Sequence, residues 1–213
     1  MDVLDKGYVK LVDIMGNDWT PVEAARVSYN AGLKGEEQDT KLMKYLLRNG
    51  HTSPFEMVEI MWEVKAPIFV ARQWVRHRTA NWNEVSARYT EVDEFYIPDK
   101  WRGQDTKNKQ GSVGTAFTEE DYYVTCLRSL ETYRGMLRDG VSREMARMVL
   151  PQSMYTKWVW KNDLHNTLRF LKLREDDHAQ WEIQQYAKAM RTQLEEKLPT
   201  LMSVWYNVEQ ERG

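Results

Sequence analysis

An alternating segment in the first third of the chain constrains the fold most strongly. Every second residue is apolar, in the order Val58, Ile60, Trp62 and Val64, while methionine and glutamate fill the positions between them. This period of two predicts a strand with one face buried against a core. Pro67 follows at once and suits the first position of a helix. A half-buried strand that leads directly into a helix indicates a sheet packed by helices.

The other patterns mix helices with strands that are not neighbours in sequence. Thr20, Pro21 and Glu23 form a capping box with proline at the first helical position, and Gly50 suits a helix end. Besides the helix that Pro67 opens, we expect helices at residues 20–30, 37–49, 118–137, 142–149, 163–171 and 178–197, and a short helical tail after Pro199. We expect strands at 8–14, 57–64, 85–92 and 154–160, a turn at 81–83 and a long surface loop at 100–114. These elements predict one α+β domain over residues 1–213, with a central, largely antiparallel or mixed sheet packed by helices.

Composition narrows the class of protein. Of the 213 residues, 42% are hydrophobic and 29% are charged, which is typical of a soluble globular domain. The formal net charge of −2 excludes a general polycation that binds nucleic acid or membranes through bulk charge. Cys126 is the only cysteine, so an intramolecular disulfide and a cysteine-based metal site are both excluded. With no signal-peptide pattern, no membrane-spanning apolar run and few histidines, we expect a cytoplasmic protein without a catalytic metal.

Positive charge is concentrated just after the helix that Pro67 opens. Residues 76–89 read RHRTANWNEVSARY, and Arg72 and Gln73 precede them by about one helical turn. Guanidinium groups match the oxygens of phosphates and carboxylates in pairs, so such a cluster indicates an anion-binding site. A solvated helix face with surface ion pairs is the alternative, but it explains less well why asparagine, glutamate, serine and tyrosine crowd the same loop.

Three further polar clusters lie elsewhere in the chain: His51 with Ser53 and Glu56, Arg143 with Arg147, and Arg169 with Arg174 and His178. Several separate cation clusters indicate two or three anionic ligands rather than one. The chain has no Gly-x-Gly-x-x-Gly and no Walker loop, so a nucleotide would not be held on a glycine-rich turn. His178 and Glu182 could share one helix face, but such pairs are more often structural than metal-binding.

Two side chains could be mistaken for nucleophiles. Ser86 lies beside Arg88 and Tyr89 without a Gly-x-Ser-x-Gly frame, and a hydroxyl next to arginine more often helps to bind phosphate. Cys126 lies among apolar neighbours in an expected helix and is predicted to be a core residue. Neither residue supports covalent catalysis.

The arginine-rich stretch resembles the signature of the flavin-dependent thymidylate synthases. That signature runs Arg-His-Arg, two residues, Ser, one residue, Asn-Glu, one residue, Ser, one residue, Arg-Tyr. The chain matches it at Arg76-His77-Arg78, Asn83-Glu84, Ser86 and Arg88-Tyr89, with Asn81 in place of the first serine. The resemblance extends to residues 51–55, 65–74, 147–151 and 173–182, and so covers most of the chain.

The resemblance implies an enzyme, a methyltransferase that makes dTMP from dUMP. Methylenetetrahydrofolate would supply the one-carbon unit and NADPH would reduce a tightly held FAD, in a homotetramer whose active sites are shared between subunits. Arg174 is implied to favour ionisation of the uracil N3, which activates the ring without an enzyme nucleophile. The residues implied to contact FAD are Ser53, Arg76, His77, Arg78, Glu84, Asp163, His165 and Arg169. Those implied to contact dUMP are Gln73, Trp74, Val75, Arg76, Glu84, Val85, Ser86, Ala87, Arg88, Arg147 and Arg174.

Two positions depart from the residues that resembling proteins usually carry. Asp163 and Arg169 stand where an amide or imidazole side chain is common, so Asp163 places an acid near the implied cofactor. Because like charges repel, this acid would need Arg169 or His165 to offset it beside cofactor phosphates.

Two other classes of protein fit parts of the pattern. Residues 72–88 interleave arginines with Trp74 and Trp82, which also suits a protein that binds single-stranded nucleic acid. The overall acidity and the spread of arginines over four clusters count against that class. An ordinary structural domain with ion-paired arginines would need no ligand. We expect neither a nucleic acid nor a membrane as a partner.

Overall fold

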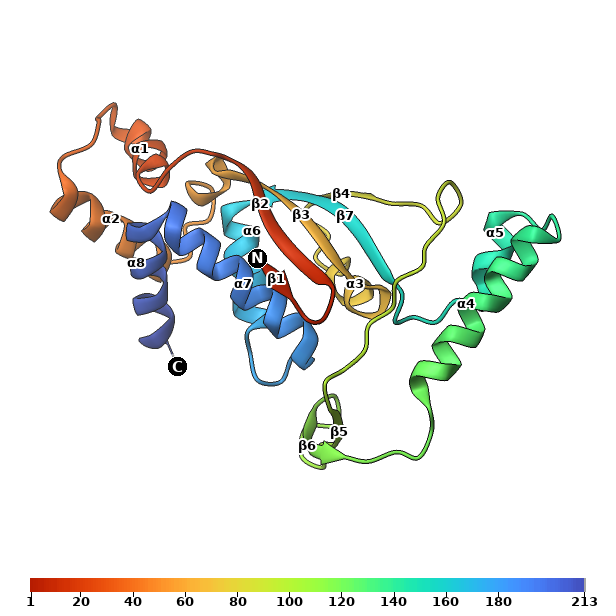
Figure 1. Cartoon of the computed structure of the whole chain (residues 1–213). Coiled ribbons are helices and arrows are strands. Elements are labelled where there is room, and N and C mark those ends of the chain that lie inside the picture. Colours follow the sequence, from red (N-terminus) through yellow and green to blue (C-terminus); the bar gives the residue numbers. More distant parts are fainter. Residues whose placement is uncertain (213) are drawn as a thin grey trace.

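An antiparallel sheet of five strands organises the protein. The computed structural model describes residues 1–212, and the strand order of its sheet is β1-β2-β3-β7-β4 (Figure 1). The strands are β1 (Asp2–Val3), β2 (Gly7–Met15), β3 (Glu59–Pro67), β7 (Tyr155–Asp163) and β4 (Asn81–Glu84). Every neighbouring pair is antiparallel. The predicted α+β class is therefore confirmed, with an antiparallel sheet.

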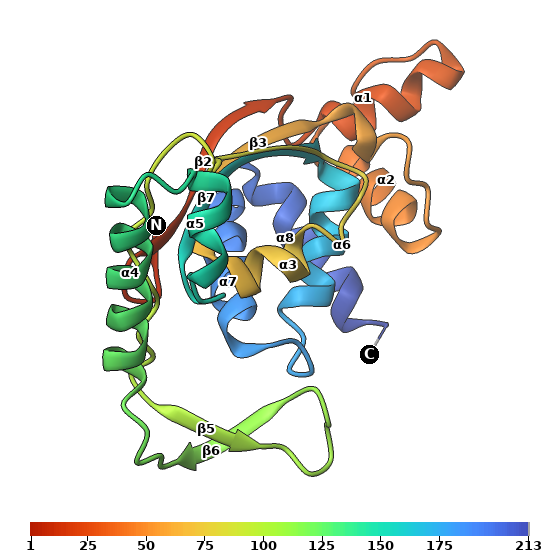
Figure 2. The ribbon, with the colours of Figure 1, turned by 90° about the vertical axis from the view of Figure 1, so that its right-hand side faces the viewer.

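Three helices cover the inner face of the sheet. They are α3 (Ile68–Trp74), α6 (Leu164–Arg174) and α7 (Trp181–Lys197), and the sheet arches over them in Figure 2. The alternating residues of β3 face this layer, and Ile60, Trp62 and Val64 have no exposed surface. Trp74 at the end of α3 lies against rings from β7 and α6 at centroid distances of 4.5 to 5.6 Å. This aromatic packing fixes the end of α3, from which the arginine-rich stretch leaves the core.

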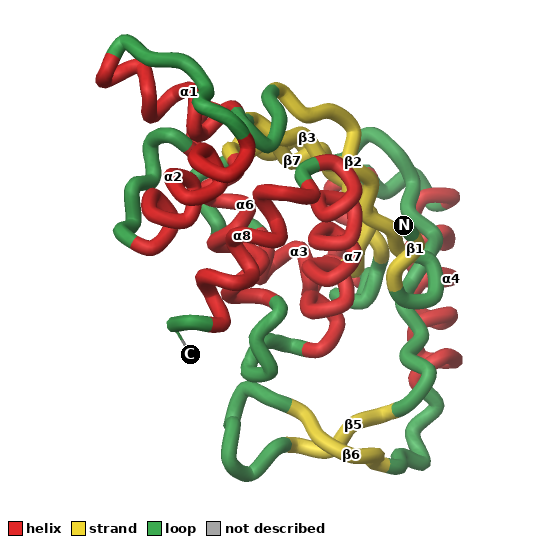
Figure 3. Tube along the Cα trace, turned by 90° about the vertical axis from the view of Figure 1, so that its left-hand side faces the viewer, coloured by secondary structure: helices red, strands yellow, loops and turns green. Residues whose placement is uncertain are grey.

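Helices from both ends of the chain pack together at one end of the sheet. They are α1 (Thr20–Arg26), α2 (Glu36–Arg48) and α8 (Pro199–Gln210), and Figure 3 shows α1 and α2 beyond the sheet. Gly50 ends α2 as predicted: its φ is +68°, and the His51 N–H donates to the Leu46 carbonyl at 3.0 Å. The capping box at Thr20 is wrong, because Trp19 is the N-cap residue and the Thr20 hydroxyl accepts from Asn17 N–H instead.

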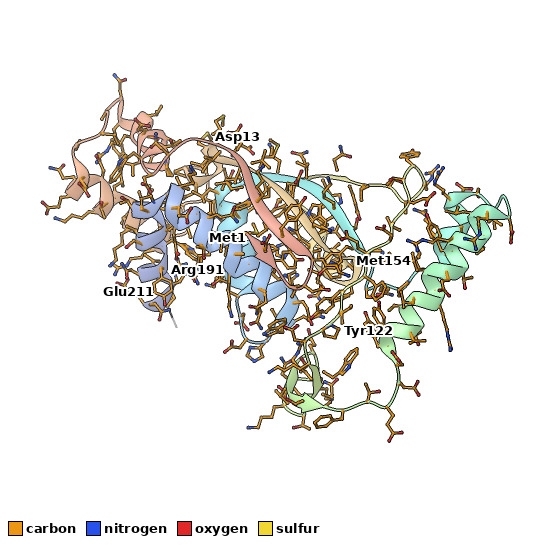
Figure 4. All side chains as sticks on the ribbon, viewed as in Figure 1. Met1, Asp13, Tyr122, Met154, Arg191 and Glu211 are labelled. Carbon is orange, nitrogen blue, oxygen red and sulfur yellow. The ribbon has the colours of Figure 1, made fainter. Side chains whose placement is uncertain are left out.

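A helical arm projects from the opposite end of the sheet. It consists of α4 (Tyr122–Arg138) and the short α5 (Arg143–Ala146), and Tyr122 at its base is labelled in Figure 4. The Asp121 carboxylate caps α4 by accepting from Val124 N–H. Cys126 is buried in a small cluster between the arm and the body, which confirms its predicted core role.

The predicted turn at residues 81–83 and the predicted strand at residues 85–92 are both wrong. The expected turn is strand β4, and the expected strand at 85–92 is instead a hydrogen-bonded turn in which Tyr89 N–H donates to the Ser86 carbonyl. Trp82 explains the difference, since its ring stacks on Trp158 of β7 at 4.4 Å and draws residues 81–84 onto the sheet edge. The local pattern of polar residues gave no sign of this tertiary contact.

The predicted loop at residues 100–114 is largely a two-stranded hairpin. Its strands are β5 (Trp101–Gln104) and β6 (Ser112–Ala116), which pair antiparallel. The hairpin has little apolar alternation because few of its residues are buried, so its composition resembles that of a loop.

Helix boundaries differ by a few residues elsewhere. The predicted 20–30 helix ends at Arg26 and continues as a 3-10 turn, while α7 begins at Trp181 rather than at 178. The helix after Pro199 has 12 residues and is longer than the expected tail. None of the helices within residues 1–212 is long and apolar enough to cross a membrane.

Candidate active site

A cavity of about 280 Å³ lies where the arginine-rich stretch meets the start of β4, the end of β7 and helix α6. Its lining residues come from these distant segments: Arg76, His77, Arg78, Thr79, Trp160, Asn162, Asn166, Arg169, Leu173 and Arg174. Packing of Trp74 in the core delivers the first three to the cavity mouth, and α6 delivers the last four. The structure thus brings Arg174 next to residues almost a hundred positions earlier, as the resemblance implied.

Arg174 is held in the cavity by two hydrogen bonds. Its Nε donates to His77 Nε2 at 3.0 Å, and its Nη2 donates to the backbone carbonyl of Gln73 at 3.2 Å. The ring of His77 is supported by an edge contact with Phe170, whose centroid lies 4.8 Å away. Both acceptors are neutral, so Arg174 is oriented without being neutralised.

The electrostatics of His77 follow from this arrangement. Burial, together with the charges of Arg174 and Arg169, lowers the pKa of His77 to about 4. The imidazole is therefore uncharged at neutral pH and free to accept from Arg174. Burial also lowers the pKa of Arg174 below its usual value, yet an arginine stays protonated in proteins.

The cavity is rich in cations and in unused donors. Among residues 1–212, no carboxylate lies within 4.0 Å of a guanidinium nitrogen of Arg76, Arg78 or Arg169. The buried Trp160 Nε1 and Asn162 Nδ2 also have no partner within the described chain. Unpaired cations and unsatisfied buried donors fit an anionic ligand that carries several acceptor atoms.

Arg169 also lines a second cavity, and His51 is shared between that cavity and a third. The second, of about 200 Å³, is lined by His51, Thr52, His165 and Arg169 among others. The third, of about 730 Å³, is lined by His51 and Ser53, near α1 and α2. Ser53 and His165 thus lie on a run of three hollows that are linked by the shared lining residues Arg169 and His51.

Asp163 has a structural task in this part of the fold. Its Oδ1 accepts from Asn166 N–H at 2.8 Å and its Oδ2 accepts from Asn166 Nδ2 at 2.7 Å, which caps α6. Both carboxylate oxygens are therefore engaged at a helix N-terminus, where negative charge is favoured. This cap explains an acid at position 163 without any ligand.

The second half of the signature lies at the other end of β4. Glu84 accepts from Thr156 Oγ1 at 2.6 Å and from Trp82 Nε1 at 3.0 Å. Ser86 accepts from the backbone N–H of Arg88 at 3.2 Å, and Arg88 lies 3.7 Å from a carboxylate oxygen of Glu144 in α5. Within one chain, residues 84–88 do not line the cavity that holds Arg174.

Other predicted site residues fall into different environments. The Trp74 side chain has no exposed surface, so only its backbone could contact a ligand, whereas Val75 is 46% exposed. Arg147 is exposed in the 3-10 turn after α5, and its Nε donates only to the Glu144 carbonyl at 3.3 Å. Val85 and Ala87 belong to the turn at the end of β4.

The structure adds residues that the sequence did not assign to this site. Asn162 and Asn166 line the cavity, and Gln180 and Glu182 form a hydrogen-bonded chain to Gln73. Gln180 and Glu182 lie in a segment that the family resemblance covers, which was the one signal available for them. No sequence pattern pointed to Asn162, because it lies near the end of strand β7 and does not interrupt the alternation of buried and exposed residues there.

Comparisons with known proteins find relatives over most of the chain. A family model described as "Thymidylate synthase complementing protein" matches residues 10–200. A flavin-dependent thymidylate synthase of Thermus thermophilus is 54% identical over 203 residues, covering 92% of this chain and 74% of that protein. The one from Thermotoga neapolitana is 50% identical over 198 residues, covering 92% and 89%.

A solved structure agrees with the fold as well. The UMP/dUMP methylase PolB from Streptomyces cacaoi, bound with 5-Br dUMP, has a TM-score of 0.85 at 31% identity, with 97% of each chain covered. The family model spans more than half of the chain, and the Thermus relative shares more than half of the aligned residues. The chain therefore belongs to the family of flavin-dependent thymidylate synthases.

Proposed function

We propose that this protein methylates dUMP reductively to dTMP, with methylenetetrahydrofolate as carbon donor and NADPH as reductant through FAD. Membership of the family supports the reaction. The observation that carries the proposal is the orientation of Arg174 by His77 and by the Gln73 carbonyl inside a cation-lined cavity. A fixed, desolvated cation of this kind stabilises negative charge that develops on a ring.

Arg174 performs the activating role in this proposal. A guanidinium has five N–H donors, and two of them are used by His77 and Gln73, so three remain for a ligand. A uracil ring placed against them would lose its N3 proton more readily, because the cation stabilises the anion. Fixed charge in a dry site contributes several kcal/mol, roughly, to such stabilisation. Neutral His77 holds the guanidinium without competing for the substrate's charge.

This activation of the uracil ring requires no nucleophile from the protein. The Ser86 hydroxyl accepts from a backbone N–H and has no base beside it within the described residues. Cys126 is buried, with Ser153 Oγ 3.8 Å from its sulfur, and lies outside the arginine cavity. Both observations fit activation of the ring by electrostatics rather than by a covalent enzyme intermediate.

The run of hollows fits a dinucleotide cofactor with phosphates. We assign Arg76, His77, Arg78 and Arg169 to its anionic part, and Ser53 and His165 to further contacts. Of the other residues implied to contact FAD, Asp163 contributes the cap of α6, and Glu84 lines none of these hollows within one chain. The unpaired guanidiniums and the unsatisfied donors of Trp160 and Asn162 support this assignment. When bound, the flavin would supply the redox chemistry, while the protein supplies orientation and electrostatics.

The dUMP site is proposed to be completed by a second subunit in a homotetramer. Residues 84–88 and Arg147 lie away from the Arg174 cavity, with β4 between them. Met145 of the α4–α5 arm and Met148 of the 3-10 turn that follows it are 52% and 69% exposed, which suits burial against another copy. A symmetric assembly would place one chain's Ser86 and Arg88 beside another's Arg174.

The nucleic-acid alternative finds no support. The arginines of residues 76–78 line a cavity with Arg174 rather than one face of an open groove, and Trp74 is buried in the core instead of offering a ring for bases to stack on. The visible absorption spectrum of the purified protein tests the proposal. We expect a bound-flavin spectrum that NADPH bleaches in the absence of oxygen, whereas a colourless tetramer that does not take up added FAD would contradict it.

A further inference from the structure

One buried acid, Glu182, is not used by the proposed chemistry. Glu182 is 3% exposed in the first turn of α7, and both carboxylate oxygens are hydrogen-bonded. Oε1 accepts from an Nη atom of Arg102 in the β5–β6 hairpin, and Oε2 accepts from Gln180 Nε2 at 2.9 Å. The Arg102 guanidinium also lies over the Trp181 ring, 4.8 Å from its centroid. The hairpin thus supplies the counter-charge that lets this carboxylate be buried.

The chain of hydrogen bonds continues to a substrate residue. Gln73 Nε2 donates to Gln180 Oε1, and the backbone carbonyl of Gln73 accepts from Arg174 at 3.2 Å. Four side chains are therefore linked in the order Arg102, Glu182, Gln180 and Gln73. A cavity of about 600 Å³ between the hairpin, α3 and α7 is lined by all four of them.

The negative charge of Glu182 sets the direction of each hydrogen bond between the amide side chains of Gln180 and Gln73. A carboxylate only accepts, so Gln180 must turn its NH₂ group toward Glu182 and its carbonyl oxygen toward Gln73. Gln73 must then donate its NH₂ group to Gln180. Its own carbonyl oxygen, Oε1, takes no part in these hydrogen bonds and is left available as an acceptor. An amide that would otherwise flip freely is held in one of its two orientations.

We infer that Glu182 is a positioning residue that, through Gln180, fixes Gln73 as a hydrogen-bond acceptor for the nucleotide. This inference rests on the proposed function, because the nucleotide is dUMP. The group that meets Gln73 must then be a donor. Apart from its phosphate, dUMP has two such groups, the 3′-hydroxyl and the uracil N3–H. Arg102 holds the carboxylate in place, so the hairpin contributes to the site from outside it.

Glu182→Gln tests the inference in the full-length, flavin-loaded enzyme. A glutamine at 182 can donate, so the chain of amides can reverse and present the NH₂ group of Gln73 to the donor on dUMP. We expect the KM for dUMP to rise about 10-fold with kcat within about twofold, since the lost contact serves binding. In a Gln73→Ala background the same substitution should change KM by less than about twofold, because no amide is left to orient.

Gln185→Ala is the matched control. Gln185 donates to the Trp181 carbonyl on the same helix and has no hydrogen bond to Gln73. The KM of Gln185→Ala for dUMP should therefore equal that of the unaltered protein. Retained flavin absorbance and an unchanged melting temperature would show that Glu182→Gln remains folded. An equal rise in KM in both Gln73 backgrounds would mean that Glu182 acts through structure alone, and the inference would be overturned.

Direct binding of analogues identifies the donor. Dissociation constants are measured for dUMP, for 2′,3′-dideoxyuridine 5′-monophosphate and for N3-methyl-dUMP, with and without Glu182→Gln. The loss of affinity caused by Glu182→Gln should vanish for whichever analogue lacks the group that faces Gln73. A loss of affinity that persists for both analogues would refute the acceptor role. Binding is read without turnover, and dTMP formation by the unaltered protein separately decides the proposed function.

Discussion

At the scale of single residues, the site depends on hydrogen bonds that orient Arg174 without neutralising its charge. Arg174 donates to an uncharged His77, and Gln73 fixes it from the backbone. The sequence identified the charged residues, and the resemblance predicted that Gln73 and Arg174 act on one ligand. No local pattern could reveal that Glu182 meets Arg102, because 80 residues separate them and the contact exists only after the hairpin folds onto α7.

Replacement of Arg174 by alanine should separate catalysis from folding. The variant loses the oriented cation but no core contact, so we expect flavin binding to persist while kcat falls about 100-fold or more. Arg174→Lys keeps a charge but not the forked geometry, and should recover only part of the rate. Steady-state dTMP formation and flavin absorbance measure the two effects. Unimpaired turnover in Arg174→Ala would refute the activating role.

His77 predicts a pH dependence of stability in flavin-free protein. Its folded pKa of about 4 lies below the 6.5 of an unfolded histidine, so between these values the unfolded chain binds more protons. The free energy of unfolding should therefore fall as pH decreases from 6.5 to 4, and this contribution should be constant above 6.5. His77→Gln keeps an acceptor for Arg174 and should flatten this slope. Denaturant unfolding at several pH values measures this slope. Equal slopes for the unaltered protein and for His77→Gln would contradict the prediction.

At the scale of elements, long patterns were predicted well and short ones were not. The alternation from Val58 to Val64 predicted β3 because burial acts on every second residue of a long strand. β4 has only four residues, and stacking of Trp82 on Trp158 decides its position. The β5–β6 hairpin buries too little apolar surface to leave a pattern. Elements of this kind are set by tertiary contacts, which a local pattern does not contain.

The cap of α6 can be tested by a matched pair of variants. Asp163→Ala removes both hydrogen bonds to Asn166 and should cost about 1 kcal/mol of unfolding free energy. Asp163→Asn keeps an acceptor for the backbone N–H and should cost only a few tenths of a kcal/mol. Denaturant titration measures both. Equal losses in the two variants would show that the cap is not what position 163 contributes.

At the scale of the whole molecule, the residues proposed for the dUMP site fall into two separate groups within one chain. The Arg174 cavity lies at one end of β4, and Ser86 and Arg88 lie at the other. The resemblance implied active sites shared between subunits, but the sequence did not predict strand β4, which lies between these two groups of residues. The exposed apolar arm of α4 and α5 offers a surface on which copies could assemble.

Complementation between two inactive variants tests this sharing. Arg174→Ala and Arg88→Ala should each abolish most activity, because each removes one half of every site. Mixed tetramers assembled from both should regain activity at about a quarter of their sites, where each neighbour supplies the intact half. The assay is dTMP formation after co-refolding or co-expression. Mixed tetramers as inactive as either parent would place both residues in one subunit's site.

The central claim is that this chain makes dTMP with a flavin and without a nucleophile of its own. The most direct measurement is dTMP formation by the purified, flavin-loaded protein from dUMP and methylenetetrahydrofolate, with and without NADPH. We predict turnover that requires both co-substrates and that persists in Cys126→Ala and Ser86→Ala at a measurable, if reduced, rate. A flavin-loaded tetramer that forms no dTMP under these conditions would contradict the account.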